Sequence, residues 1–286
     1  MDLRLPDVLV VGAQKSGTQT LFNDLAGVTG LHLPPFSKES SFLVRRPVGR
    51  RVDRIRYAWM FRAGAATQLG VDVSTRYAMQ PRHEGVAEAA RRLFPDPPRI
   101  LYILRHPLDR SLSHHHHDVL LGRTSLSAAE AIQPGQPYVD YSRYAWQLEP
   151  WLDYVGSESV HLIRFEDYVA DRTAGVEAVC RFLGVLPARS TAIDQDAVYN
   201  RTGERIAPRG WPGRLVRHPL WTRYGRRLVP ADVRQRAKSR VSDPAPPRPT
   251  KPSHEAVADA VEVLADDVDR LRALHSRAPK WDLSCW

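Results

Sequence analysis

A short apolar run followed by a loop of small polar residues constrains the fold of this chain most. Residues 7–12 read Asp-Val-Leu-Val-Val-Gly, a β-branched run of the length of a buried strand. The segment Gln14–Thr20 is rich in Ser, Thr and Gly, and apolar residues at helical spacing follow it to about Ala26. The chain therefore predicts a strand, a loop and a helix in direct succession.

A second unit of the same kind starts at Arg99. Residues 100–104 form a predicted strand, and Pro107 suits the first turn of a helix that runs to about Leu121, because the missing N–H of proline has no partner there. Other patterns predict strands at 70–74 and 161–165 and helices at 85–93, 144–155, 174–183 and from Ser253. Strands that alternate with helices predict an α/β fold, here a single P-loop-like domain in which helices flank a central, mostly parallel sheet.

Length and composition agree with one globular domain. The chain has 286 residues, of which 43% are hydrophobic and 26% charged. We predict an α/β domain over residues 1–243, a stiff proline-rich connector over 244–252, and a C-terminal helix and tail over 253–286 that dock on the same domain. Two cysteines are too few for a disulfide scaffold, and the sequence has no run of apolar residues long enough for a membrane span. We therefore expect a cytoplasmic protein.

The excess of basic residues raises the question of nucleic-acid binding. Lys and Arg number 41 against 32 Asp and Glu, which gives a formal charge of +9. The basic residues are nearly all arginine and are spread along the chain, so we expect no nucleic-acid partner. A polyanionic nucleotide ligand accounts for part of the charge equally well.

The loop after the first predicted strand has the properties of an anion site. Free backbone N–H groups and the helix dipole favour an anion where a strand passes into a helix. Gly12 and Gly17 have the spacing of the Walker A motif, but Thr18 stands where that motif requires lysine, and the lysine lies at position 15. The second predicted strand ends in Arg105-His106 and not in the acidic residue that would hold Mg²⁺. Triphosphate chemistry is therefore disfavoured.

The stretch from Val8 through Phe42 resembles the 5'-phosphosulfate-binding region of sulfotransferases that use 3'-phosphoadenosine-5'-phosphosulfate (PAPS). It is most similar to the branch that contains heparan-sulfate sulfotransferases and their bacterial relatives, and Gln14-Lys-Ser-Gly-Thr18 is the motif. The resemblance implies that Lys15 contacts the bridging oxygen and stabilises the leaving group. It also implies that the 5'-phosphate and sulfate are held by Gln14, Lys15, Ser16, Gly17, Thr18, Gln19 and Thr20.

A second motif concerns the 3'-phosphate of PAPS. Sulfotransferases hold it with an arginine at the end of a central strand and a serine eight residues later, and Arg105 and Ser113 have that spacing. An arginine offers a fork to phosphate oxygens, and the serine lies near the positive end of a helix. Arg110 and Ser111 lie nearby, and we expect them to be ordinary helix-surface residues.

The resemblance also implies a general base. In this branch a glutamate shortly after the first helix deprotonates the acceptor, and Glu39 matches that position. The alternative for Glu39 is a solvated loop carboxylate. Lys38 could assist either the sulfate or the acceptor, and Asp72 could orient the acceptor or serve a structural role. The implied reaction moves the sulfuryl group to a hydroxyl or amine of a glycan, lipid or secondary metabolite by in-line displacement, without a metal.

A run of histidines lies within the helix predicted after Pro107. Four consecutive histidines, His114–His117, fan around a helix in steps of about 100°, so a structural or substrate-facing role is favoured over a metal site. Candidates for a loop that closes over the nucleotide are Arg201, Arg205 and Arg209.

The alternative functions are a Mg-dependent kinase on a variant phosphate loop and a catalytically silent nucleotide- or polyanion-binding protein.

Overall fold

The computed structural model describes residues 4–34, 38–44, 51–189, 192–195, 249–284 and 286. Within these residues a five-stranded sheet has the order β2-β3-β1-β4-β5, and every neighbouring pair is parallel. The strands are β1 (Val8–Gly12), β2 (Leu31–His32), β3 (Leu69–Val73), β4 (Arg99–Leu104) and β5 (Val160–Arg164). Because the strands are parallel, their carboxyl ends share one edge, where the loops that carry the predicted site begin.

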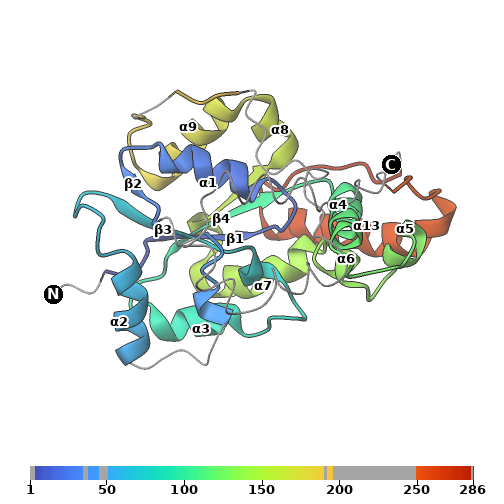
Figure 1. Ribbon diagram of the computed structural model, residues 1–286, viewed down its shortest axis with the longest axis horizontal. Coiled ribbons are helices and arrows are strands. Elements are labelled where there is room, and N and C mark those ends of the chain that lie inside the picture. The colour runs from blue at the N-terminus through green and yellow to red at the C-terminus, as the bar shows by residue number, and fades with distance from the viewer. Residues whose placement is uncertain (1–3, 35–37, 45–50, 190–191, 196–248, 285) are drawn as a thin grey trace, which may run out of the picture.

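Helices cover both faces of the sheet (Figure 1). One face carries α1 (Thr18–Ala26), α8 (Phe165–Ala170) and α9 (Arg172–Leu183), and the other carries α2 (Arg51–Met60), α3 (Val86–Leu93) and α7 (Tyr144–Val155). A third group lies beside the sheet and consists of α4 (Pro107–Leu120), α5 (Ala128–Ala131), α6 (Pro137–Asp140) and α13 (Ala258–Leu274). Short 3-10 turns are η1 (Phe42–Val44), η2 (Thr75–Ala78), η3 (Ser157–Ser159) and η5 (Glu255–Val257).

The central strand β1 is apolar on both of its faces because both faces are covered. All five of its residues are buried. Val8 and Val10 pack toward the core under α1 and α9, while Leu9 and Val11 pack toward the core under α3 and α7. A continuous apolar run of this kind is typical of a parallel strand between two helical layers.

The connections that leave β1 and its neighbour β3 run to opposite faces of the sheet. The chain after β1 enters α1, and the chain after β3 enters η2 and α3 on the other face. In an open α/β sheet such a reversal leaves a crevice outside the carboxyl ends of the two strands. The topology therefore places a ligand site beside the ends of β1 and β3.

The predicted elements agree closely with the observed ones. The helix predicted at 144–155 has those bounds, and the predicted strands at 70–74 and 161–165 each lie one residue earlier. Phe165, predicted as the end of a strand, instead opens α8. The last helix begins at Ala258 after a 3-10 turn, and Ser253 Oγ accepts a hydrogen bond from the N–H of Ala256 in that turn. The sequence patterns did not predict β2, α2, α5, α6 or α8.

Buried polar contacts join the layers. Asp24 on α1 accepts hydrogen bonds from Arg172 at 2.6 and 2.9 Å and from the hydroxyl of Tyr168 at 2.7 Å, and its ion pair with Arg172 is almost entirely buried. On the other side, Asp267 of α13 accepts the N–H groups of Ala145 and Trp146 at the start of α7. These contacts hold α1 and α7 in place on either side of the sheet.

Candidate active site

The loop between β1 and α1 has the shape of an anion cradle. Lys15 and Gly17 have left-handed backbone angles, with φ of 71° and 85°. The N–H of Ala13 donates to the carbonyl of Ile103 at 2.8 Å, which ties the start of the loop to β4. Gly17 is the N-cap residue of α1 and has no side chain to cap it, so the first N–H groups of the helix face the loop and can bind an anion.

Gly17 is required by space as well as by backbone angle. A Cβ at this position would lie 2.7 Å from two ring carbons of Phe165, the first residue of α8. The guanidinium carbon of Arg105 lies 5.3 Å from the centre of the same ring. Phe165 therefore connects the phosphate loop with the predicted 3'-phosphate arginine, and no pattern in the sequence indicated this role.

Lys15 is partly buried in the loop, and its charge is easily lost. Burial, aided by the nearby charges of Arg110 and Arg123 and opposed by Asp118, lowers the pKa of its ammonium group to about 8. An anionic ligand beside such an ammonium group favours its charged form and raises its pKa again. The environment of Lys15 thus suits a residue that meets negative charge.

The other predicted residues lie in the loop and in the first turn of α1. Thr18 and Ser16 are buried, and Thr20 is partly buried in the first turn. The amide of Gln19 is engaged within the helix, where its Nε2 donates to Oδ1 of Asn23 at 3.1 Å. Gln14 is anchored through its carbonyl, which accepts a hydrogen bond from Arg110 at 3.4 Å.

Arg105 and Ser113 occupy the positions expected from the sequence. Arg105 directly follows β4, and its backbone is held by Tyr144, whose hydroxyl donates to the Arg105 carbonyl at 2.7 Å and accepts its N–H at 3.3 Å. Ser113 lies on α4 with a partly buried side chain. Their part in binding a 3'-phosphate stays a prediction.

The prediction that Arg110 and Ser111 lie on the helix surface is wrong, because both are fully buried. Arg110 donates to Ser142 Oγ and to the carbonyl of Tyr138, each at 2.5 Å, besides its bond to the carbonyl of Gln14. Ser111 Oγ donates to the same Tyr138 carbonyl at 2.6 Å. The face of α4 that carries these residues packs on α6 and the phosphate loop, so Arg110 places a fixed positive charge behind the loop.

The predicted base lies beside the phosphate loop. Residues 38–40 run along the end of β3, where the N–H of Glu39 donates to the carbonyl of Val73 at 2.7 Å. Lys38 Nζ lies 3.3 Å from Thr18 Oγ1 and 3.3 Å from Glu39 Oε1. Burial lowers the pKa of Lys38, whereas its contact with Glu39 raises it. The Glu39 side chain is 39% exposed, so it is in part open to solvent.

Asp72 belongs to the support of this segment. It is fully buried, and its Oδ2 accepts hydrogen bonds from Ser40 Oγ at 2.9 Å, from the hydroxyl of Tyr77 at 2.7 Å and from that of Tyr57. Burial raises the pKa of Asp72 to about 6, although these hydrogen bonds lower it. Of the two roles open for Asp72 in the sequence, its contacts favour the structural one.

The four histidines are mostly packed into the protein. His114 lies against the rings of Tyr138 and Tyr141, with centroid distances of 4.8 and 5.8 Å, and burial lowers its pKa to about 2. His115 Nε2 bonds to the carbonyl of Leu126 at 2.8 Å. Among the residues that the structure describes, no three His, Cys, Asp or Glu side chains form a group that could hold a metal ion.

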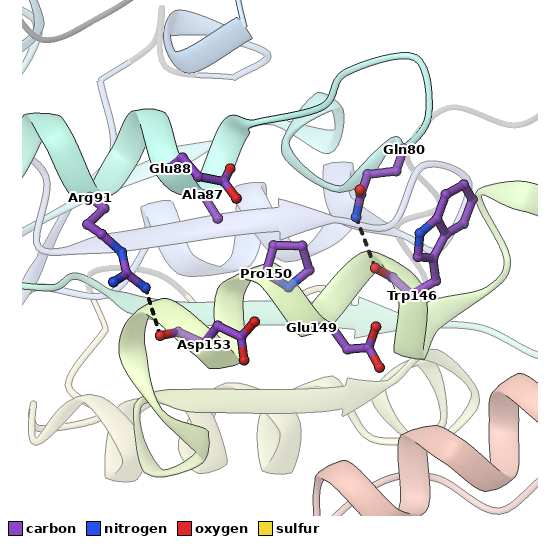
Figure 2. A pocket seen from close by; sticks show the side chains of 8 residues that line it. All are labelled: Gln80, Ala87, Glu88, Arg91, Trp146, Glu149, Pro150 and Asp153. Atoms are coloured by element: carbon purple, nitrogen blue, oxygen red, sulfur yellow. Dashed lines mark hydrogen bonds between the residues drawn. The ribbon is translucent and has the colours of Figure 1, made fainter.

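A groove of about 350 Å³ lies between α3 and α7, away from the predicted site residues. Figure 2 shows its lining, in which Gln80 Nε2 donates to the carbonyl of Trp146 at 2.9 Å. That carbonyl lacks its usual helical partner because Pro150, four residues on, has no N–H. Gln80 thus supplies the hydrogen bond that Pro150 cannot make.

No helix in the described ranges combines the length and apolar character needed to cross a membrane. The candidates for a closing loop, Arg201, Arg205 and Arg209, lie outside the described residues.

The comparisons with known proteins agree with this geometry. The family model for the sulfotransferase domain matches residues 5–202, more than half of the chain. A sulfotransferase of known structure from Alicyclobacillus acidocaldarius is 24% identical, with an alignment that covers 99% of each chain and a TM-score of 0.62. This likeness confirms the predicted α/β fold, with a sheet that is parallel throughout the described residues. No curated protein matches the chain.

Two other solved structures are more distant. The sulfotransferase domain from the Synechococcus PCC 7002 olefin synthase is 17% identical over 93% of this chain and 96% of that one, with a TM-score of 0.49. Mouse sulfotransferase SULT7A1, solved as a complex with PAP, is 18% identical over 84% and 86%, with a TM-score of 0.41. Membership of the family rests on the match of residues 5–202 to the family model and not on these distant structures. The chain therefore belongs to the sulfotransferase domain family of PAPS-dependent enzymes.

Proposed function

We propose that this sulfotransferase moves the sulfuryl group of PAPS to a hydroxyl or amine of a glycan, lipid or secondary-metabolite acceptor, with Glu39 as the general base. One observation carries the proposal. Lys38 Nζ lies 3.3 Å from Thr18 Oγ1 of the phosphate loop and 3.3 Å from Glu39 Oε1. A single ammonium group thus joins the predicted donor site to the predicted base.

The residues around the loop fit a polyanionic donor. Lys15, Lys38 and Arg110 surround it with positive charge, and the N-terminus of α1 adds its free N–H groups. Gln14, Ser16, Gly17, Thr18, Gln19 and Thr20 would hold the 5'-phosphosulfate, and Arg105 with Ser113 would hold the 3'-phosphate. Fixed cations at these positions do the work that a metal ion does in kinases.

The chemistry assigned to the chain is a proton transfer and a charge neutralisation. Glu39 accepts the proton of the attacking hydroxyl or amine as the new bond to sulfur forms. Lys15 donates to the bridging oxygen that keeps the electron pair of the broken sulfur–oxygen bond, and adenosine 3',5'-bisphosphate leaves. Lys38 contacts Thr18 of the predicted donor site and the predicted base Glu39, so it can stabilise the sulfuryl group during transfer.

Binding of adenosine 3',5'-bisphosphate tests the donor half without knowledge of the acceptor. Calorimetric titration should give tight binding that is unchanged by Mg²⁺, and loss of affinity in Lys15→Ala. Binding of ATP that depends on Mg²⁺, with no binding of the bisphosphate, would refute the assignment in favour of a kinase.

The catalytic half needs turnover. Incubation with PAPS and fractionated cell extract, followed by mass spectrometry for an added sulfuryl group, identifies an acceptor. With that acceptor, Glu39→Gln should lower kcat by about 10²- to 10⁴-fold and leave bisphosphate affinity unchanged. Glu158→Gln is the matched control, because Glu158 is an exposed carboxylate in η3 at the far end of the sheet. A wild-type rate in Glu39→Gln would show that another group is the base.

A further inference from the structure

Thr75 makes the closest contacts to the carboxylate of Glu39. It directly follows Ser74 at the end of β3 and opens η2. Its Oγ1 donates to Glu39 Oε1 at 2.9 Å, and its N–H lies 3.2 Å from Oε2 and 3.4 Å from Oε1. Thr75 is itself buried, so these donors are held in one place by the fold.

The two oxygens of Glu39 are not equivalent. Oε1 accepts hydrogen bonds from Thr75 Oγ1 at 2.9 Å and from Lys38 Nζ at 3.3 Å, whereas the better-placed partner of Oε2 is the N–H of Thr75 alone. A carboxylate oxygen has two lone pairs. Oε1 is therefore fully engaged by its side-chain donors, and Oε2 keeps capacity for one more donor.

The backbone of Glu39 is fixed by the same strand end. Its φ is 58°, in the left-handed region, and its N–H donates to the carbonyl of Val73. The next residue, Ser40, is bound to the buried Asp72, which also bonds to Tyr77. Val73 thus holds the main chain of Glu39, Asp72 holds the adjacent Ser40, and Thr75 holds the carboxylate.

We propose that Thr75 is the positioning residue of the general base: it holds Oε1 and turns Oε2 toward the acceptor as the oxygen that takes the proton. The inference rests on the proposed function of Glu39. A group that is held this way loses no rotamer freedom on the way to the transition state, which is how positioning contributes to rate.

Thr75→Val tests the inference because valine keeps the shape of threonine and removes only the hydroxyl. We expect kcat to fall about tenfold, the typical effect of one hydrogen bond to a charged group, with little change in the KM for PAPS.

Thr75→Ser is the matched control, since it restores the hydroxyl and should recover the rate. Bisphosphate affinity, which does not involve Thr75, verifies that each variant is folded. If valine turns out not to fold, the comparison of Thr75→Ala with Thr75→Ser carries the same test. A wild-type kcat in Thr75→Val, or a loss of kcat that Thr75→Ser does not recover, would overturn the positioning role. A wild-type rate in Glu39→Gln would instead overturn the assignment of the base, so the two failures are distinct.

Discussion

The charge of Lys15 should make nucleotide binding depend on pH in a range where few side chains titrate. Burial lowers the pKa of Lys15 from 10.5 to about 8, with Arg110 and Arg123 acting in the same direction. Lysine is charged when protonated, so the free enzyme loses this positive charge as the pH rises through about 8. A bound polyanion favours the charged form and raises the pKa of the same group in the complex.

The size of the effect follows from linkage. Near pH 7 Lys15 is protonated in both states, so it adds no pH dependence to the affinity for adenosine 3',5'-bisphosphate. Above about pH 8 the complex must take up a proton, and affinity should fall about tenfold for each further pH unit until the pKa of the complex is reached. At about pH 9 the loss is therefore about tenfold, or about 1.4 kcal/mol.

Calorimetric titration at about pH 7, 8 and 9 measures this dependence, and buffers with different ionisation enthalpies count the protons taken up. Lys15→Arg keeps the charge over the whole range and should remove the slope. Lys15→Met should bind more weakly but with equal affinity at all three values. If Lys15→Met keeps the slope of the wild type, another group causes it and the reasoning from the burial of Lys15 is refuted.

Three further outcomes are expected. Gly17→Ala should abolish bisphosphate binding, because a Cβ at φ 85° would overlap the ring of Phe165; binding at wild-type affinity would show that the loop adapts. Asp24→Asn should lower the free energy of unfolding by about 3–5 kcal/mol in urea titrations, because it leaves the buried guanidinium of Arg172 without its counter-charge; a loss below about 1 kcal/mol would contradict this. Arg105→Ala should weaken the binding of adenosine 3',5'-bisphosphate and leave the binding of adenosine 5'-phosphosulfate unchanged. Equal losses of affinity for both ligands would place Arg105 away from the 3'-phosphate.

Local sequence patterns predicted most of the fold. A β-branched run predicts a strand over 7–12, which the structure has at 8–12, and Pro107 predicts a helix start, because each depends on neighbours within a few residues. The elements that were not predicted are short or carry mixed patterns. The strand β2 has two residues, and the α2 helix has three arginines among its ten residues and leaves Val52, Ile55 and Trp59 exposed, so packing on the rest of the domain decides both.

The sequence resemblance placed the candidate site, and the structure supplied its connections. Arg105 was predicted at a strand end and lies there, but its neighbour Arg110 was misplaced on the surface. A helical pattern that contains arginine and serine indicates an exposed face unless buried polar partners exist, and the partners Tyr138 and Ser142 come from a different element. Periodicity alone could not identify them.

By itself the sequence determined the strand-loop-helix units, the motif Gln14–Thr18 and the family to which the chain belongs. These properties depend on residues adjacent in the chain, whose spacing is visible without a structure. Only the tertiary structure brought Thr75 to Glu39 across 36 positions and joined Lys38 to Thr18. Such contacts arise when parallel strands bring their carboxyl ends to one edge, and side chains distant in sequence then share a site.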